Sequence, residues 1–459
     1  MSRFESLPAS HNKKQFADAN DELDPVRSTE PNNREEKMKN VTAVILAAGM
    51  GSRMRSDVPK VLHRIASRTM LERIMSNLKR SGVEDILAVV GYKAERIENL
   101  FREQLRFVRQ PELLGSGDAL AHAVDFMNSR ENSVLVTCGD TPLISPATFR
   151  KIVKTHFRDN ASCVLLTARV DDPSSYGRIL RDKNGNIARI IEEKDLIGAE
   201  KKINEINVGT YCFHKSEIVK YIREIEMNEK KKEFYLTDIV DILRKKGKKV
   251  ISVSCGKKEE HIGVNSRKEL AEVNALVYRE KAEELMSSGV TIVDPDTAYI
   301  DDSASIGRDT IIFPNTVIES GVRVGKGCRI GPFARLREGT VLRDNVEIGN
   351  FVEICRSEIG KSSRVKHHTY LGDAVVGKDV NVGAGTITAN YDGKEKNRTI
   401  IGDGVFLGVG SILIAPIKVG SGAVIGAGSV VTRNKNVGKG KVVAGVPAKE
   451  IIKKGRRHE

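Results

Sequence analysis

The hydrophobic positions of this chain follow two different patterns, which meet near residue 290. From residue 41 to about 266, short apolar runs alternate with segments of helical periodicity. The runs at 41–46, 86–90 and 133–137 predict buried strands, and 69–80 predicts a helix. Strands that alternate with helices indicate a Rossmann-like α/β domain with a mostly parallel sheet, whose binding sites lie at the C-terminal ends of its strands.

Beyond residue 293 an aliphatic residue recurs every six positions. The uninterrupted series is Ile306, Ile312, Ile318, Val324, Ile330, Leu336, Leu342, Ile348 and Ile354. After short phase shifts the period returns from 365 to 382 and again from 401 to 431. One hexapeptide makes one flat side, and three make a triangular coil with its aliphatics inside. The second pattern therefore predicts an all-β left-handed parallel β-helix of hexapeptide repeats.

These patterns divide the chain into five parts. Residues 1–39 are polar and aperiodic, which predicts a disordered N-terminal extension. We expect the α/β domain at 40–266, a linker helix at 267–289, the β-helix at 290–435 and a basic tail at 436–459. Residues 388–398 interrupt the six-residue period, so they should protrude as a loop, where functional residues are common.

Composition limits the partners and the compartment. The net charge is +14, but the basic residues are spread along the chain without a nucleic-acid-binding motif. No run approaches the ~20 apolar residues that span a bilayer, and the N-terminus lacks a signal-peptide pattern. The six cysteines have no metal-binding spacing. We therefore expect a reduced, cytoplasmic protein that binds neither nucleic acid nor membranes and whose charge attracts phosphorylated small molecules.

A glycine loop follows the first predicted strand. The string Leu46-Ala47-Ala48-Gly49-Met50-Gly51-Ser52-Arg53-Met54 leads toward Pro59-Lys60. Small residues let backbone N–H groups approach a phosphate chain, and Arg53 and Lys60 supply compensating positive charge. This string resembles the N-terminal motif of sugar-1-phosphate nucleotidyltransferases.

Further segments resemble that family in the same order along the chain. Gln110 with Gly115 and Ser116 resembles the loop that reads the nucleobase, and Cys138-Gly139-Asp140 ends a predicted strand. The resemblance implies that Asp140 and Asn265 hold Mg²⁺, and that Arg53 and Lys60 are catalytic. It also implies that the nucleotide and the sugar contact Leu46, Ala47, Ala48, Gly49, Lys60, Gln110, Gly115, Ser116, Cys138, Gly139, Asp140, Gly177, Glu192, Asn207 and Asn265.

The combination of this domain with a hexapeptide solenoid resembles one family over residues 41–432. The solenoid matches are 331–337, the string His367-His368-Thr369-Tyr370-Leu371-Gly372-Asp373, 381–386 and 390–393. They resemble the bifunctional N-acetylglucosamine-1-phosphate uridyltransferases/glucosamine-1-phosphate acetyltransferases. That resemblance implies two reactions: acetyl-CoA-dependent acetylation of glucosamine-1-phosphate, and then uridylyl transfer from UTP to N-acetylglucosamine-1-phosphate with release of pyrophosphate.

The same resemblance assigns roles in the solenoid. His367 would be the general base of acetyl transfer, a role that suits an imidazole. Arg337, Tyr370 and Asn381 would bind the sugar phosphate, with Asn390 and Tyr391 in the loop beside them. Ala384, Asn390, Tyr391 and Ala427 would contact acetyl-CoA. The family also implies a homotrimer.

The chain departs from the family at several positions. Cys355 stands where the family has a Lys near the sugar phosphate, and strand alternation gives no ground for expecting Arg356 to replace it. Val409 stands where a Ser is usual, and the solenoid is shorter by about two coils of ~18 residues. Leu113 and Asp118 in the base-reading loop predict a looser preference for uracil.

Two alternatives stay open, the first because of Cys355 and the second because some regulatory proteins combine similar domains. One is a sugar-1-phosphate nucleotidyltransferase whose solenoid serves only as a trimerisation scaffold. The other is a non-enzymatic regulatory or translation-factor subunit, which the intact glycine loop, Arg53, Lys60 and Asp140 disfavour.

Overall fold

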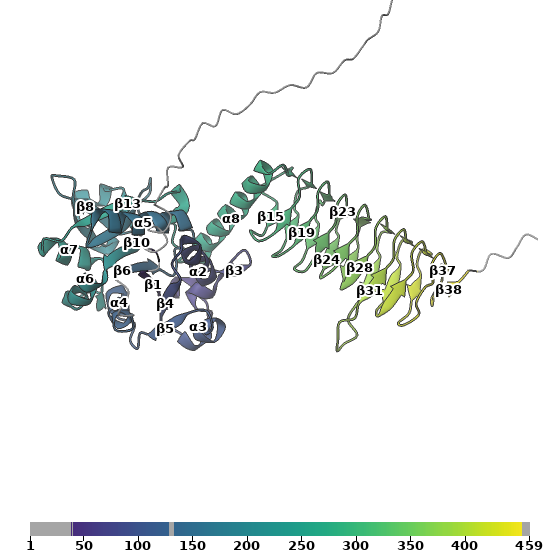
Figure 1. The fold of residues 1–459 in the computed structure, drawn as a ribbon, viewed down its shortest axis with the longest axis horizontal. Coiled ribbons are helices and arrows are strands. Elements are labelled where there is room, and N and C mark those ends of the chain that lie inside the picture. The colour runs from purple at the N-terminus through teal and green to yellow at the C-terminus, as the bar shows by residue number, and fades with distance from the viewer. Residues whose placement is uncertain (1–37, 39, 128–132, 452–459) are drawn as a thin grey trace, which may run out of the picture.

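The computed structural model describes residues 38, 40–127 and 133–451. An α/β domain and a solenoid lie at opposite ends of a long helix, α8 (Arg267–Ser287) (Figure 1). The predicted disordered extension falls outside the described residues except for Met38, and so do residues 452–459 of the predicted tail.

The α/β domain is built on one mixed sheet. Its strands run in the order β13-β7-β10-β6-β1-β4-β5, and only β10 along this path is antiparallel to its neighbours. This arrangement confirms the mostly parallel sheet. The strands are β1 (Val41–Ala47), β4 (Asp85–Val90), β5 (Arg106–Arg109), β6 (Ser133–Cys138), β7 (Cys163–Arg169), β10 (Glu205–His214) and β13 (Val250–Ser254), with β8 (Arg178–Arg181) and β9 (Ile187–Ile191) attached to β10.

Helices cover both faces of this sheet. Along β1, Ala43 and Ile45 enter one buried cluster while Val44 enters the other, as strand alternation requires. The helices are α2 (Met70–Ser81), α3 (Ala94–Phe101), α4 (Ser116–Val124), α5 (Pro146–Asp159), α6 (Lys215–Tyr221) and α7 (Asp238–Lys245). Short elements complete the domain: η1 (Ser52–Met54), η2 (Lys60–Leu62), η3 (Glu193–Asp195), η4 (Gly198–Lys202), η5 (Ile222–Glu224), η6 (Lys258–His261), β2 (Arg64–Ile65), β3 (Arg68–Thr69), β11 (Met227–Asn228) and β12 (Glu233–Phe234).

Helix α8 joins the two parts by burying a different stretch in each. Near its start, Val273 and Val277 pack with Ile65 and Met70 of the α/β domain. Near its end, Ala282 and Leu285 belong to the core of the solenoid. The helix lies within the predicted linker, and among the described residues no helix is long and apolar enough to cross a membrane.

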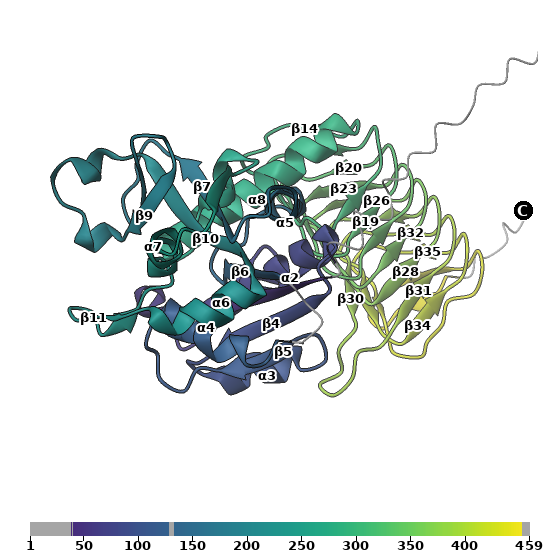
Figure 2. The same ribbon diagram turned by 60° about the vertical axis from the view of Figure 1, so that its left-hand side comes forward.

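The solenoid is a left-handed β-helix with three parallel sheets as its sides (Figures 1 and 2). The first side contains β14 (Thr291–Ile292), β17 (Ile311–Ile312), β20 (Arg329–Ile330), β23 (Glu347–Asn350), β26 (Arg364–His367), β29 (Asn381–Val382), β32 (Phe406–Leu407), β35 (Val424–Ile425) and β37 (Val442–Ala444). The short strand β38 (Lys449–Glu450) pairs antiparallel with β37 at the end of this side. The second contains β15 (Tyr299–Ile300), β18 (Val317–Ile318), β21 (Arg335–Leu336), β24 (Glu353–Cys355), β27 (Tyr370–Gly372), β30 (Ile387–Ala389), β33 (Ile412–Ile414) and β36 (Val430–Val431). The third contains β16 (Ser305–Ile306), β19 (Arg323–Val324), β22 (Val341–Leu342), β25 (Glu358–Ile359), β28 (Ala374–Val376), β31 (Thr399–Ile401) and β34 (Ile417–Val419).

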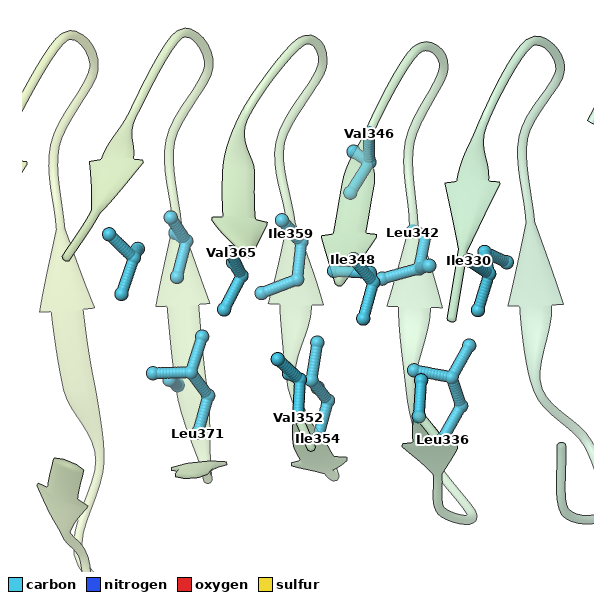
Figure 3. Packing of buried hydrophobic residues seen from close by; sticks show 14 of the residues in the cluster. Ile330, Leu336, Leu342, Val346, Ile348, Val352, Ile354, Ile359, Val365 and Leu371 are labelled. Carbon is cyan, nitrogen blue, oxygen red and sulfur yellow. The ribbon is translucent and has the colours of Figure 1, made fainter. Parts of the chain in front are cut away.

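The six-residue aliphatic period forms the core of the solenoid. Ile330, Leu336 and Leu342 come from three successive sides and point into one interior (Figure 3). Each is at most 1% exposed. The first side continues through β37, so paired structure extends into the segment where the sequence predicts a basic tail. The predicted loop between β30 and β31 leaves the coils as expected (Figure 1).

Candidate active sites

The glycine loop lies at the C-terminal end of β1 and borders a cavity of about 440 Å³. The predicted residues that line it are Leu46, Ala47, Ala48, Gly49, Lys60, Gln110, Gly115, Ser116, Cys138, Gly139 and Asp140. Gly139 shows why the residues that follow the strands must be small here. A Cβ at that position would lie 2.8 Å from Val61 Cγ1 and 3.0 Å from the Leu46 carbonyl oxygen. The sequence motifs therefore converge on one pocket at the sheet edge.

Lys60 lies between the two residues predicted to hold a metal. Its Nζ is 2.5 Å from Asp140 Oδ2 and 2.6 Å from Asn265 Oδ1. The Val264 amide donates to the Asp140 carbonyl at 2.8 Å, which brings Asn265 beside the end of β6. One carboxylate and one amide oxygen therefore converge on a single cationic group. Oxygen donors of this kind suit Mg²⁺, which takes few protein ligands and completes its shell with water and phosphate oxygens.

Gln110, which is predicted to read the base, is buried in the wall of the cavity. Its Nε2 donates to the Gly115 carbonyl at 3.0 Å and to Asp118 Oδ2 at 2.7 Å. Both partners only accept hydrogen bonds, so the amide nitrogen must face them and Oε1 is left as the acceptor. Asp118, noted in the sequence as a departure, thus fixes the orientation of Gln110.

The residues predicted to hold the sugar lie around the β8–β10 region. The Asn207 amide donates to the Gly177 carbonyl at 2.9 Å, and a Cβ at Gly177 would lie 3.7 Å from Glu192 Oε1. Glu192 accepts a hydrogen bond from Thr237 Oγ1 at 2.8 Å, while burial raises the pKa of its carboxyl group. Nearby, burial raises the pKa of the Cys138 thiol to about 12, so that thiol stays neutral and unsuited to nucleophilic chemistry.

Arg53 is not brought into this cavity. It lies on η1 with its side chain exposed. The sequence reasoning also missed Arg267, the first residue of α8. Its Nε donates to the Met54 carbonyl at 3.3 Å and its Nη1 lies 3.2 Å from His63 Nδ1. Helix α8 therefore contacts the end of the glycine loop directly. No local sequence motif predicted this contact.

In the solenoid, His367 ends strand β26 on the first side and is exposed. Its Nδ1 lies 2.9 Å from Asn350 Oδ1, on the preceding coil, because parallel pairing of β23 with β26 sets these residues opposite each other. An amide oxygen only accepts, so Nδ1 is the donor in this contact, and in the neutral form of the ring the lone pair is on Nε2. Asn350 was not among the predicted residues, although its spacing of one coil before His367 could have indicated it.

Tyr370 and Asn390 meet over Gly372 on the second side. A Cβ at Gly372 would lie 2.5 Å from the Tyr370 hydroxyl and 2.7 Å from Asn390 Nδ2. Asn390 also donates to Asp373. Asn381 is half-buried in β29 beside β26, and Tyr391 is 61% exposed in the loop. The glycine is required because two predicted substrate-binding side chains occupy the space above it.

Ala384 and Ala427 lie in one row along a corner of the solenoid, with Val409 between them. The Gly410 amide donates to the Ala384 carbonyl at 2.7 Å, and the Gly428 amide donates to the Val409 carbonyl at 2.7 Å. Val409 is 59% exposed. The predicted acetyl-CoA residues therefore share a small, apolar edge on successive coils.

The surroundings of Cys355 correct the expectation for Arg356. Arg356 has φ +47, in the left-handed region, so the strand alternation that would point it away from Cys355 ends there. Its Nη1 lies 2.8 Å from Cys355 Sγ, and its Nε and Nη2 donate to the two Asp373 oxygens at 2.7 and 2.9 Å. Arg337, on the preceding coil, pairs with Glu353 at 2.9 Å. The positive charge missing at Cys355 is thus present next to it.

Known proteins match both parts of the chain. A MobA-like NTP transferase domain matches residues 43–233, a GMPPB C-terminal domain 292–391 and a hexapeptide repeat of succinyl-transferase 398–433. The bifunctional protein GlmU of Shouchella clausii is 41% identical over 410 residues, which cover 82% of this chain and 90% of that protein. GlmU of Carboxydothermus hydrogenoformans is 42% identical over 82% of this chain and 91% of its own length. The chain belongs to the GlmU family.

Family membership covers both candidate sites described above. The alignment with the GlmU relatives spans 410 residues, more than either domain alone contains. The family predicted from the sequence motifs and the two-part architecture are therefore confirmed. The match over both domains favours two activities over the scaffold-only and regulatory alternatives, because these relatives are named as bifunctional proteins.

Proposed function

We propose that this chain makes UDP-N-acetylglucosamine at two separate active sites, one in each domain. It is a transferase that acetylates glucosamine-1-phosphate and then transfers a uridylyl group to the product. Identity of about 40% to GlmU proteins across both domains is the observation that carries this function. We assign uridylyl transfer to residues 40–266 and acetyl transfer to 290–435.

For uridylyl transfer, a phosphate oxygen of N-acetylglucosamine-1-phosphate attacks the α-phosphorus of UTP, and pyrophosphate leaves. The O–P bond that forms replaces the one that breaks, so no protein nucleophile is needed. The backbone N–H groups of the glycine loop and the Lys60 ammonium bind phosphate oxygens and stabilise the charge that develops on them. Asp140 and Asn265 would hold Mg²⁺, which supplies further charge neutralisation when it is bound. Gln110 would accept a hydrogen bond from the base.

For acetyl transfer, the amine of glucosamine-1-phosphate attacks the thioester carbonyl of acetyl-CoA. A C–N bond forms, the C–S bond breaks, and the amine proton passes through His367 Nε2 to the departing thiolate. The hydrogen bond from Nδ1 to Asn350 holds the imidazole in the tautomer that this step needs. Tyr370, Asn381 and Asn390 would orient the sugar, and Ala384 and Ala427 would border acetyl-CoA, with Tyr391 at the exposed end of the loop.

The later coils of the solenoid support a trimer. Ile387, Phe406 and Val409 are 42%, 49% and 59% exposed. Ile387 lies on the second side, Phe406 on the first side, and Val409 at the corner between these two sides. Exposed apolar residues grouped on a solenoid favour association with further copies, because solenoid faces need covering. Light scattering on the purified chain is expected to give three times the monomer mass.

Two assays on the same preparation test the function. Glucosamine-1-phosphate with acetyl-CoA should release free thiol, and N-acetylglucosamine-1-phosphate with UTP and Mg²⁺ should release pyrophosphate. Thiol and pyrophosphate together are the expected result. Pyrophosphate without thiol would reduce the solenoid to a scaffold, and neither product would refute the proposal as a whole.

A further inference from the structure

The second side of the solenoid is bordered by two charged or titratable residues at opposite corners. Strand β27 runs from Tyr370 to Gly372 along this side. His367 precedes it around one corner, on β26, and Arg356 follows the parallel strand β24 around the other corner. A side of three residues is about 10 Å wide at ~3.3 Å per residue. In glucosamine-1-phosphate the amine and the phosphate are on adjacent carbons, so a sugar bound over this side needs the His367 imidazole and the Arg356 guanidinium to reach toward each other from the two corners.

Arg356 reaches over this side because of its backbone. Its φ of +47 turns the side chain back across the end of β24, and its Nη1 lies 2.8 Å from Cys355 Sγ. Cys355 pairs with Gly372 in the parallel register. The contact between Arg356 and Cys355 therefore lies one coil before the place where Tyr370 and Asn390 lie over Gly372. The small Cys355 side chain leaves room for the guanidinium, where a longer side chain would compete for the same space.

Arg356 retains hydrogen-bond donors for a ligand. A guanidinium has five N–H groups. Nε and Nη2 donate to Asp373, and Nη1 donates to Cys355, so one N–H on Nη1 and one on Nη2 stay available. N–H groups on the two terminal nitrogens of a guanidinium can bind phosphate oxygens in a bidentate way.

Asp373 connects Arg356 to the rest of the site. Its carboxylate accepts both from Arg356 and from Asn390, and the Arg356 guanidinium holds its pKa below the usual range. Arg337 lies beside Cys355 on the preceding coil, where its amide donates to the Ile354 carbonyl at 2.8 Å, and its buried Nε has no partner among the described residues. Two guanidinium groups therefore flank one thiol at the end of the side that lies opposite His367.

We infer that Arg356, together with Arg337, binds the phosphate of the acetyl acceptor, and that in this chain it takes the role left vacant at Cys355. The inference rests on the proposed acetyl transfer. It makes Arg356 a substrate-binding residue and Asp373 the residue that positions it.

The variant Arg356→Gln tests this assignment in the thiol-release assay on the full chain. We expect KM for glucosamine-1-phosphate to rise at least tenfold while kcat falls less than threefold, because the ion pair to phosphate is lost and the His367 end is intact. Arg356→Lys keeps the charge beside Asp373 but not the bidentate donor pair, so its KM should lie between those of the unmodified chain and of Arg356→Gln. Adding Cys355→Lys to Arg356→Gln should recover most of the lost affinity.

Arg343→Gln is the matched control. Like Arg356, Arg343 forms an ion pair with an acidic residue on the next coil, here Glu358 at 2.6 Å, but this pair lies on the third side of the solenoid. Its KM should equal that of the unmodified chain. An unchanged KM in Arg356→Gln, in a chain that does release thiol, would overturn the inference, and so would a KM that Cys355→Lys fails to lower. Absence of thiol release from the unmodified chain would instead contradict the proposed acetyl transfer. If Arg356→Gln does not fold, the KM of Arg356→Lys decides the question alone.

Discussion

The Lys60 ammonium lies 2.5 Å from the Asp140 carboxylate, although 80 positions separate the two residues in the chain. Lys60 starts η2 after the glycine loop, and Asp140 follows β6, the parallel neighbour of β1. Asn265 completes the group at 2.6 Å from the same Nζ. The Lys60 ammonium therefore holds three segments of the chain together at the edge of the sheet.

Asp140→Ala should lower the rate of pyrophosphate release at least a hundredfold. The change removes the only carboxylate in this group and leaves Lys60 with Asn265 alone. Pyrophosphate release is measured with N-acetylglucosamine-1-phosphate and UTP, and thiol release in the same protein should stay normal because the second site is in the solenoid. Asp241→Ala, which removes an exposed pair with Lys245, serves as the control. Unchanged turnover in Asp140→Ala would refute the assignment.

His367→Ala should reduce thiol release by two to four orders of magnitude, the usual contribution of a general base. The adjacent His368 provides the comparison: it stacks on Phe351 with ring centroids 5.0 Å apart and makes no contact with Asn350 through its ring in the described structure. His368→Ala should therefore keep most of the activity. Equal losses in both variants would show that the corner as a whole, rather than the His367 imidazole, supports the reaction.

Asp118→Leu should weaken the selection of the nucleobase. Without the carboxylate, the Gln110 amide can turn over and present its NH₂ group instead of Oε1. Uracil presents an N–H donor where cytosine presents an acceptor, so the ratio of kcat/KM for UTP to that for CTP should fall at least fivefold. Asp125→Asn, at an exposed pair with Arg223, should leave the ratio unchanged. A constant ratio in Asp118→Leu would show that Gln110 is held without Asp118.

His156 should make the α/β domain sensitive to mild acid. Its side chain is fully buried, and its Nε2 is hydrogen-bonded to Ser133 Oγ at 2.9 Å. The centroids of the His156 and His214 rings are 4.3 Å apart. Burial lowers its pKa to about 4, whereas an unfolded chain has a histidine pKa of about 6.5. The unfolded state thus binds the proton more readily below pH 6.5, and stability is lost as the pH falls from there toward 4.

At pH 5 this loss amounts to about 2 kcal/mol from His156, at 1.36 kcal/mol per pH unit. It is measured as the drop in the urea midpoint of the α/β domain between pH 7 and pH 5. His156→Gln can keep the hydrogen bond to Ser133 but cannot take up a proton, so its midpoint should fall less over the same range. An equal fall in both proteins would place the acid sensitivity elsewhere.

The chain sequence alone determined the repeating and local features of this protein. The six-residue aliphatic period fixed the solenoid, because each coil repeats the same buried position and needs no distant information. The helix predicted at 69–80 is present at Met70–Ser81, since Thr69 and Glu72 cap it through contacts three residues apart. The glycine loop, and the family resemblance that it carries, could also be recognised from residues adjacent in the chain.

The tertiary structure decided everything that depends on contacts between distant segments. A backbone hydrogen bond from Val264 brought Asn265 to Asp140, parallel register set Asn350 against His367, and helix α8 placed Arg267 on the glycine loop. Strand alternation alone gave no reason to place Arg356 beside Cys355, because alternation holds only while the backbone stays extended. A single left-handed residue at the corner turned that guanidinium toward the site, and only the folded coil shows that Asp373 holds it there.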